Sequence, residues 1–483
     1  MVATGHGTTS RFLNSLLTSV HQQISVTQTV ETERSGQFEG LTPSQPELAN
    51  VGSSSKVDRD QHPARVLIIE SNEDGTVGGS HQALFDLAAH LDRTRFEPVV
   101  LFNQDNVFVG HLRARGIEVI LFDQILRGER EINRSGRQVA KIFGFGAAVM
   151  RRRRELGRLR IDLVHLNNSP AIGSDDWLPA TRLAGIPCVA TAAGDSGPPR
   201  RWLHRWLYRR FDAYLAISHY MAGVLRERGV DPGRIELVYV GVDFQNLRER
   251  MVRAREDVRA ELGVEPHQLL VLMVGNIRAW KGQREVIAAL RLLPEEVRVR
   301  LRVCFAGATA KVDSDYEADL RAEIAAGGLG DCVSFLGSRS DVADLYGAAD
   351  IAVHASTTPE PFGLVVPEAM ALNCAVIAAS SGGPTEVITP GTGFLCDPNV
   401  PAEYAQALEQ LVQDDSLRHA IAAAGPARAS HFSIERTVEG TQRVYERALK
   451  RFVWGRRRLT PVLQHSLDSA PRDSGPDEVG VPA

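Results

Sequence analysis

The sequence predicts an α/β protein built from two doubly wound, Rossmann-like halves. Short apolar runs alternate with helical stretches from Arg65 onward, and the alternation starts again after a charged helical segment at 248–262. Such alternation is typical of buried parallel strands covered by helices. A chain of 483 residues is also too long for one ordinary core. We therefore expect two domains joined near 242–265, with a ligand cleft between them.

The apolar runs define the expected strands of each half. The first half has six, at 66–70, 98–102, 118–122, 163–166, 187–192 and 214–217. The second half has five, at 269–274, 301–306, 333–336, 351–354 and 375–379. A last helix is expected at 433–452, where apolar residues recur at helical spacing.

Both ends of the chain depart from this pattern. Residues 1–63 are rich in Ser, Thr, Gln, Glu and Gly, which predicts a disordered extension. Within it, 12–24 has apolar residues at helical spacing; a transient helix is the simpler interpretation and an amphipathic docking helix the alternative. The tail at 455–483, rich in Pro, Asp and Ser, is expected to be loose.

Composition restricts the class of protein. The net charge is −4, with 24% charged and 43% hydrophobic residues, which describes a soluble globular protein with no reason to bind nucleic acid. No apolar stretch approaches a membrane span, and no secretory signal is recognisable. Five scattered cysteines without a CxxC pair predict packed, reduced thiols in a cytoplasmic protein.

In each half, the segment after the first expected strand can bind an anion. Gly78 and Gly79 lie in a turn between strand and helix, where backbone amides and the helix dipole favour negative charge, although a plain turn explains them equally well. After the strand at 269–274 comes Gly275-Asn276-Ile-Arg278-Ala-Trp-Lys281. Two cations at the carboxyl end of a strand suit a diphosphate leaving group, with an exposed basic helix start as the alternative.

A third segment carries two acids around a helix start. Pro367 suits the first turn of a helix, which places Glu368 just inside it and Glu360 on the loop before it. Phe362, Gly363 and Leu364 then offer backbone amides, and a simple cap does not account for both acids. A fourth segment, Gly382-Gly383-Pro-Thr-Glu386, repeats the glycine turn and is unspecific by itself.

Together these motifs resemble the retaining glycosyltransferases of family 4, which have the GT-B fold. The resemblance spans about Arg65 to Phe452 and is most specific in the second half, where Lys281-Gly282, Glu360-x7-Glu368 and Gly382-Gly383-x-x-Glu386 occur in the family's order. It implies two Rossmann-like domains facing a central cleft, with the C-terminal helix crossing back. The implied domains are an acceptor domain at 64–245, a nucleotide-sugar donor domain at 246–435 and a crossing helix at 436–454.

The resemblance also implies roles for particular residues. Glu360 would contact the donor sugar, Glu368 the ribose, and Lys281 and Arg278 the pyrophosphate. The donor-binding set would be Gly275, Asn276, Phe362, Gly363, Leu364, Glu368, Gly78 and Gly79. The implied reaction moves a hexose from a UDP-, GDP- or ADP-linked sugar to a saccharide or lipid-linked acceptor with retention. No cofactor or metal is expected, and Asp313-Ser-Asp315 precedes a helix away from the usual metal position.

Two departures from the family pattern affect this assignment. Asn276 stands where many members have Arg, so Arg278 is the candidate replacement. The first domain lacks the His that usually follows the strand at 187–192; Asp195 is one substitute, and His165 and Asn167 are other acceptor-side candidates. A lone His at a strand end is more often structural. The departures concern the acceptor rather than the donor.

Two interpretations remain open for membrane contact, and the function has alternatives as well. Arg200–Arg210 mixes cations with aromatics at helical spacing, which fits an anionic membrane at the inner face as well as it fits a helix packed on the core. For Arg151–Arg154 a solvated helix is the preferred interpretation. The alternatives to a transferase are a catalytically degenerate nucleotide-sugar-binding protein and a nucleotide-sugar epimerase of the same fold.

Overall fold

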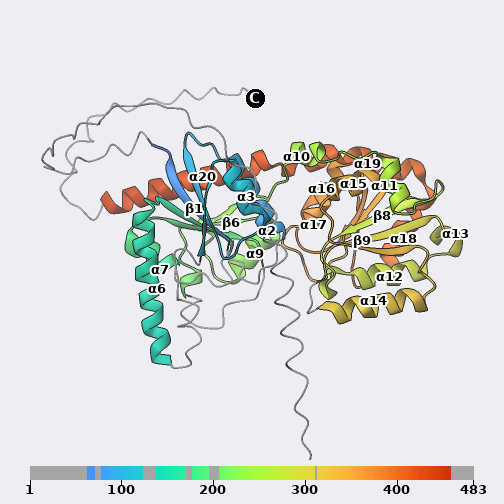
Figure 1. The fold of residues 1–483 in the computed structure, drawn as a ribbon, viewed down its shortest axis with the longest axis horizontal. Helices are drawn as coiled ribbons and strands as arrows, with labels where there is room; N and C mark the ends of the chain where they lie inside the picture. The colour runs from blue at the N-terminus through green and yellow to red at the C-terminus, as the bar shows by residue number, and fades with distance from the viewer. Residues whose placement is uncertain are drawn as a thin grey trace, which may run out of the picture. The chain divides into compact units, whose positions relative to one another are not determined.

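Two parallel sheets covered by helices make up the described part of the chain (Figure 1). The computed structural model describes residues 62–70, 78–122, 138–169, 177–194, 206–309 and 313–457. The predictions for 1–61, including the helix at 12–24, and for the tail beyond 457 lie outside these residues. The seven- and six-stranded sheets confirm the predicted fold class.

The first sheet has the strand order β3-β2-β1-β4-β5-β6-β7, and all pairs are parallel. Its order places β1 between β2 and β4, as in a Rossmann sheet. The six predicted strands are present, and a seventh was missed. The strands are β1 Ala64–Glu70, β2 Phe96–Phe102, β3 Glu118–Leu121, β4 Leu163–Ser169, β5 Cys188–Ala192, β6 Ala213–Ala216 and β7 Ile235–Leu237. The helices are α2 Gly79–His90, α3 Val107–Ala114, α6 Gln138–Arg158, α7 Trp177–Ala184 and α9 His219–Glu227.

The second sheet repeats this order as β10-β9-β8-β11-β12-β13, again parallel. The five predicted strands are present, with one short strand missed. The strands are β8 Leu269–Val274, β9 Leu301–Ala306, β10 Val333–Gly337, β11 Ile351–Val353, β12 Ala375–Ala379 and β13 Phe394–Cys396. The helices are α12 Gln283–Leu292, α13 Glu295–Arg298, α14 Ser314–Ala326, α15 Val342–Ala348, α16 Val365–Ala371, α17 Pro384–Val387, α18 Pro401–Gln413 and α19 Asp415–Ala429.

The connection between the two sheets corrects one prediction. The single helix expected at 248–262 is two helices, α10 Phe244–Glu249 and α11 Arg255–Glu261. The chain between them is held by Asp344, whose carboxylate accepts hydrogen bonds from the amides of Val252 and Arg253 at 2.7 and 2.9 Å. Because these tertiary hydrogen bonds take the place of helical ones, the helix is interrupted there.

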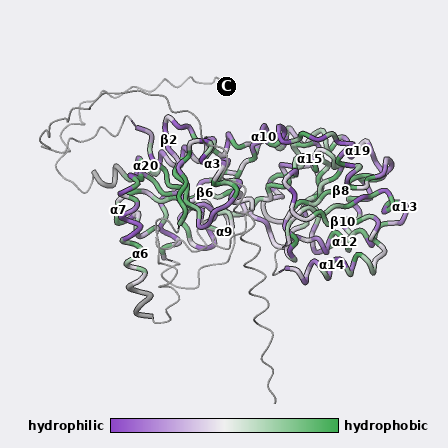
Figure 2. The backbone as a smooth tube through the Cα atoms, in the orientation of Figure 1, coloured by the Kyte–Doolittle hydropathy of each residue, from purple (hydrophilic) through white to green (hydrophobic). Residues whose placement is uncertain are grey.

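Hydrophobic residues concentrate in the strands, as Figure 2 shows for β6 and β8. Strands buried on both faces read as continuous apolar runs, which is why their positions could be predicted. All five cysteines are buried and free, as expected for packed thiols. Among the described residues, no helix combines the length and the apolar character that crossing a bilayer requires.

The last helix, α20 Ile434–Arg457, returns to the first sheet (Figure 1). Val438, Val444 and Tyr445 lie in the same hydrophobic cluster as residues of β1 and β2. The side chain of Gln442 also accepts a hydrogen bond from the Asp92 amide, at 2.8 Å. These contacts confirm that the C-terminal helix crosses back to the first half.

Candidate functional site

The candidate site begins where two neighbouring strands of the second sheet end. β8 and β11 are neighbours in the sheet, but the chain continues from β8 to β9 toward one edge of the sheet and from β11 to β12 toward the other. In open α/β sheets, ligands bind at the carboxyl ends of strands at such a switch point. The loop after β8 carries Gly275 to Lys281, and the loop after β11 carries His354 to Glu360.

Lys281 and Glu360 meet at this point. Nζ of Lys281 lies 2.8 Å from Oε1 of Glu360, and the two side chains are 16% and 15% exposed. Lys281 ends a short 3₁₀ turn, η3 Ala279–Lys281, and its ammonium also lies 4.2 Å from the centre of the Trp280 ring. Gly282 follows with a φ of +87°, where an added Cβ would collide with the carbonyl of Ala355. The loop therefore needs glycine there to hold Lys281 in place.

Two further donors point at the same carboxylate. Nε2 of His354 and Oγ of Ser356 both lie 2.7 Å from Oε2 of Glu360. Nδ1 of His354 accepts from the Ala379 amide at 3.4 Å, so a neutral ring carries its proton on Nε2 and donates it to Glu360. Burial opposes ionisation of Glu360, but the Lys281 charge and the His354 hydrogen bond outweigh it. The pKa of Glu360 is held well below its usual range.

His354 and Ser356 had no predicted role. The available signal was their position, because polar residues that directly follow a buried parallel strand lie at the ligand edge of a sheet. His354 is 5% exposed and Ser356 is fully buried. They fix the orientation of the Glu360 carboxylate, which leaves Oε1 for Lys281.

The loop between Glu360 and α16 presents backbone amides. Within the described part of the chain, the amides of Phe362, Gly363 and Leu364 have no hydrogen-bond acceptor. Gly363 has a φ of +84°, and the side chain of Leu364 lies against the backbone of Gly79, 3.5 Å from where a Cβ would stand. The structure thus brings the predicted amides together with one of the two predicted glycines of the first half; Gly78 is the N-cap residue of α2.

The glycine pair Gly382-Gly383 supports this loop through close backbone contact. Gly382 forms a bridge with Glu360, and the Gly383 amide donates to the Glu360 carbonyl at 2.8 Å. A Cβ on Gly383 would collide with the Cα of Phe362. These glycines are needed because two backbone segments approach closely.

Glu368 lies in a different environment from Glu360. Pro367 lies in the first turn of a helix, as predicted: α16 begins two residues before it, at Val365, because the loop ends at the left-handed Gly363, and Glu368 is in the same first turn. Burial, and then the charge of Asp86 on α2, raise the pKa of Glu368 to about 8. Glu368 is therefore largely protonated at neutral pH and can donate as well as accept a hydrogen bond.

Arg278 does not join Lys281. Its Nε lies 3.4 Å from Oδ2 of Asp313, the N-cap residue of α14. Both of these atoms are buried and lack a hydrogen-bond partner among the described residues. Gly275 and Asn276 remain near Lys281: an added Cβ on Gly275 would stand 3.8 Å from the Lys281 side chain, and the Asn276 carbonyl accepts from Gln283. In the described part of the chain, no cluster of three His, Cys, Asp or Glu could hold a metal.

The acceptor-side candidates differ in where they lie. His165 lies within β4 rather than at its end, is fully buried, and bonds Tyr445 Oη and Thr191 Oγ1 at 2.6 Å each. Burial lowers its pKa to about 3, so the ring is neutral. Asn167 donates to the carbonyl of Ser80 at 3.0 Å, next to Gly79. Asp195 lies outside the described residues.

The fold and this site define a GT-B glycosyltransferase. HepE from Anabaena, solved with UDP, is 25% identical with a TM-score of 0.65, covering 79% of this chain and 99% of that one. The same protein solved with UDP-glucose gives a TM-score of 0.63 at 25% identity, covering 79% of this chain and 98% of that one. A glycosyltransferase from Rickettsia africae shares the fold at 20% identity, with a TM-score of 0.68, covering 80% and 99%.

Sequence comparison gives the family. Residues 77–246 match Glycosyltransferase Family 4, and residues 254–428 match Glycosyl transferases group 1. A D-inositol 3-phosphate glycosyltransferase from Salinispora arenicola is 31% identical over 64% of this chain and 74% of its own length. The chain spans 63% of the length of the Rhodococcus opacus enzyme of that name, also at 31% identity, over 57% of this chain. The chain belongs to the retaining glycosyltransferases of family 4.

Proposed function

We propose that this protein moves a hexose from a UDP-linked sugar to a saccharide or lipid-linked acceptor, with retention of configuration. The observation that carries the proposal is the partly buried contact of Lys281 with Glu360, oriented by His354 and Ser356. A cation and an ionised carboxylate at a sheet switch point can bind the two ends of a sugar diphosphate. The choice of UDP rests on HepE, which was solved with UDP and with UDP-glucose.

In this proposal the donor is held by the second half, 246–435. Glu360 accepts hydrogen bonds from hydroxyls of the sugar, since its low pKa keeps it ionised. Glu368, largely protonated, contacts the ribose hydroxyls, which accept and donate hydrogen bonds equally well. The first half, 64–245, takes the acceptor.

The departing diphosphate needs positive charge and N–H donors. Lys281 supplies the charge, and the amides of Phe362, Gly363 and Leu364 supply donors that nothing else in the described residues occupies. Arg278 can add a second cation, because its contact with Asp313 satisfies no hydrogen bond and a phosphate oxygen would. Preorganised groups of this kind stabilise the charge that develops as the bond breaks.

Retention follows if the acceptor hydroxyl enters on the face from which the diphosphate leaves. A phosphate oxygen then receives the acceptor proton, so no side chain has to serve as the base. The bond from the anomeric carbon to the diphosphate breaks, and the bond to the acceptor oxygen forms. A further acceptor candidate, a cyclitol phosphate rather than a saccharide or a lipid-linked sugar, is D-inositol 3-phosphate, after which the two relatives compared above are named.

A thermal-shift series tests the donor assignment. UDP-glucose should raise the melting temperature by mass action, and GDP- and ADP-glucose should not. Glu360→Gln should keep the shift caused by UDP alone but lose the extra shift caused by the sugar. If no nucleotide sugar stabilises the protein, the proposed function fails; if a GDP- or ADP-sugar does so instead, only the choice of nucleotide fails.

A further inference from the structure

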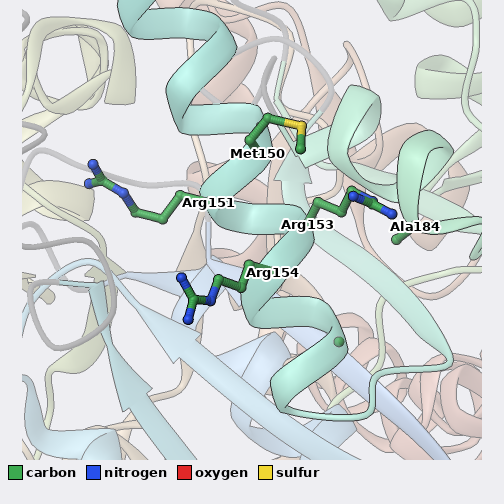
Figure 3. Close-up of a pocket in the computed structure, with 6 residues that line it drawn as sticks. Met150, Arg151, Arg153, Arg154 and Ala184 are labelled. Atoms are coloured by element: carbon green, nitrogen blue, oxygen red, sulfur yellow. The ribbon is translucent and has the colours of Figure 1, made fainter.

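The outer side of α6 and the end of α7 form an exposed, positively charged surface. Met150 is 51% exposed and Leu183 is 55% exposed, and Arg153 and Arg154 are exposed beside them. Met150, Arg153 and Ala184 border an open hollow of about 720 Å³. Figure 3 shows Arg153 reaching toward Ala184 with Met150 on the same side, while Arg151 and Arg154 extend to the left in this view; all four side chains line the same hollow.

The charge on this surface is not neutralised locally. Arg153 donates from Nε to the carbonyl of Leu183 at 3.1 Å, which leaves its charge without an acid. Among the described residues, no carboxylate lies within ion-pair distance of Arg153 or Arg154, whereas Arg158 pairs with Glu155 at 2.7 Å. A chain with a net charge of −4 has no general excess of cations that would explain this concentration.

Arg152, between these arginines on α6, is buried instead of exposed. Arg152 is 4% exposed, and its guanidinium lies over the rings of Phe122 and Trp177 at 5.6 and 5.2 Å. This contact anchors α6 to the first half, and Arg153 and Arg154 are exposed to solvent. The solvated helix expected from the sequence is therefore wrong for Arg152.

Contacts of Arg182 and Arg210 extend the surface to the segment that ends at Arg210. Arg182 donates to the carbonyl of Arg210 at 2.5 Å, and the guanidinium of Arg210 lies 4.7 Å from the centre of the Trp206 ring. Trp206 is 50% exposed, while the next residue, Leu207, is buried. In the described part of the segment, 206–210, Leu207 packs inward as in one interpretation left open by the sequence, and Trp206 faces outward as in the other. We call Met150, Arg153, Arg154, Leu183, Trp206 and Arg210 the arginine face.

We propose that the arginine face docks on an anionic lipid bilayer. The arginines fit the lipid phosphates, and the three exposed apolar side chains between them enter the interface, where tryptophan is favoured. A soluble anion would use the charges but gain nothing from Met150, Leu183 and Trp206. This inference concerns where the protein works and does not depend on the proposed donor or acceptor.

Vesicle flotation tests the proposal with the whole chain. Wild type should float with phosphatidylcholine vesicles that contain phosphatidylglycerol, and not with phosphatidylcholine alone; added salt should weaken binding. Each neutralised arginine should weaken binding about fivefold, so Arg153→Gln combined with Arg154→Gln should lose about 25-fold. The matched control is Arg291→Gln with Arg443→Gln, two exposed positions on α12 and α20. It should bind like wild type.

A second pair of variants separates a bilayer from a soluble polyanion. Met150→Ser with Leu183→Ser should weaken vesicle binding but leave binding to heparin unchanged. Circular dichroism and donor hydrolysis should be unchanged in all variants. The proposal is overturned if wild type does not bind anionic vesicles or if the arginine variant binds them like its control. It is also overturned if the serine variant floats like wild type and heparin releases both proteins from the vesicles. If wild type did not hydrolyse UDP-glucose at all, that result would instead contradict the proposed function.

Discussion

Replacing Lys281 by alanine separates its contribution to the fold from its contribution to the reaction. The substitution leaves the Glu360 carboxylate, 15% exposed, without its cation. Removing one partner of a buried ion pair costs about 3–5 kcal/mol. We expect the lower end, about 3 kcal/mol, because this pair is only partly buried and because His354 and Ser356 still donate to Glu360.

The double variant Lys281→Ala with Glu360→Gln makes the test specific. Without the charge on residue 360, the penalty for an unpaired carboxylate disappears, so most of the lost stability should return. The coupling between the two sites should amount to about 1–3 kcal/mol. Sugar transfer should not return, because in the proposed function Lys281 binds the diphosphate, and its loss alone should slow transfer by about 100-fold or more.

Urea unfolding of the single and double variants measures the stability, and release of UDP from UDP-glucose with acceptor present measures the transfer. Arg443→Ala is the control, since its pair with Glu439 is 61% and 70% exposed and should contribute less than about 1 kcal/mol. Transfer at the wild-type rate in Lys281→Ala would refute the role of Lys281. A double variant no more stable than Lys281→Ala would refute the buried-pair argument.

Three further predictions follow from the same structure. Burial raises the pKa of Glu368 from 4.5 to about 8, so the unfolded chain loses this proton at lower pH than the folded protein does. The free energy of unfolding should therefore fall by up to about 1.4 kcal/mol per pH unit as pH rises from 4.5 to about 8, and Glu368→Gln should flatten this slope in urea titrations. Gly282→Ala should destabilise the protein by about 3 kcal/mol in the same assay, since Cβ meets a backbone carbonyl at positive φ, whereas Gly78→Ala, with open space around it, should cost less than about 1 kcal/mol. Glu386→Ala removes the acceptor of the two amides that begin α9, at 2.8 and 2.9 Å, and should cost about 2 kcal/mol by urea unfolding; an unchanged midpoint would contradict this.

The strands were predictable where both faces are buried. The runs at β8, β9 and β12 match the predicted bounds because Arg302 in β9 is the one polar residue among these three strands. β7 and β13 were missed because they are three-residue edge strands, and each includes an exposed leucine, Leu237 or Leu395, both 39% exposed. A strand of that length leaves no pattern distinct from a loop.

The charged residues of the candidate site were predictable from the sequence, but several of the side-chain contacts around them were not. Lys281 and Glu360 follow strand ends, where ligand groups are expected, and the fold does bring them together. The contact of Arg278 with Asp313 depends on how α14 packs, and no spacing along the chain encodes that. His354 was visible in the sequence at the end of a strand, but its hydrogen bond to Glu360 depends on the folded loop between them.

The return of α20 determines when the first half can finish folding. Tyr445 fills the core beneath the first sheet and bonds His165, 280 residues earlier in the chain. During synthesis, the sheet that forms first must therefore wait until nearly the whole second half has been translated before its core is closed. A fragment that ends before Ile434 would leave the buried His165 ring without its tyrosine partner and would expose apolar surface on the sheet. The two halves are thus sequential in the chain but not independent as folding units.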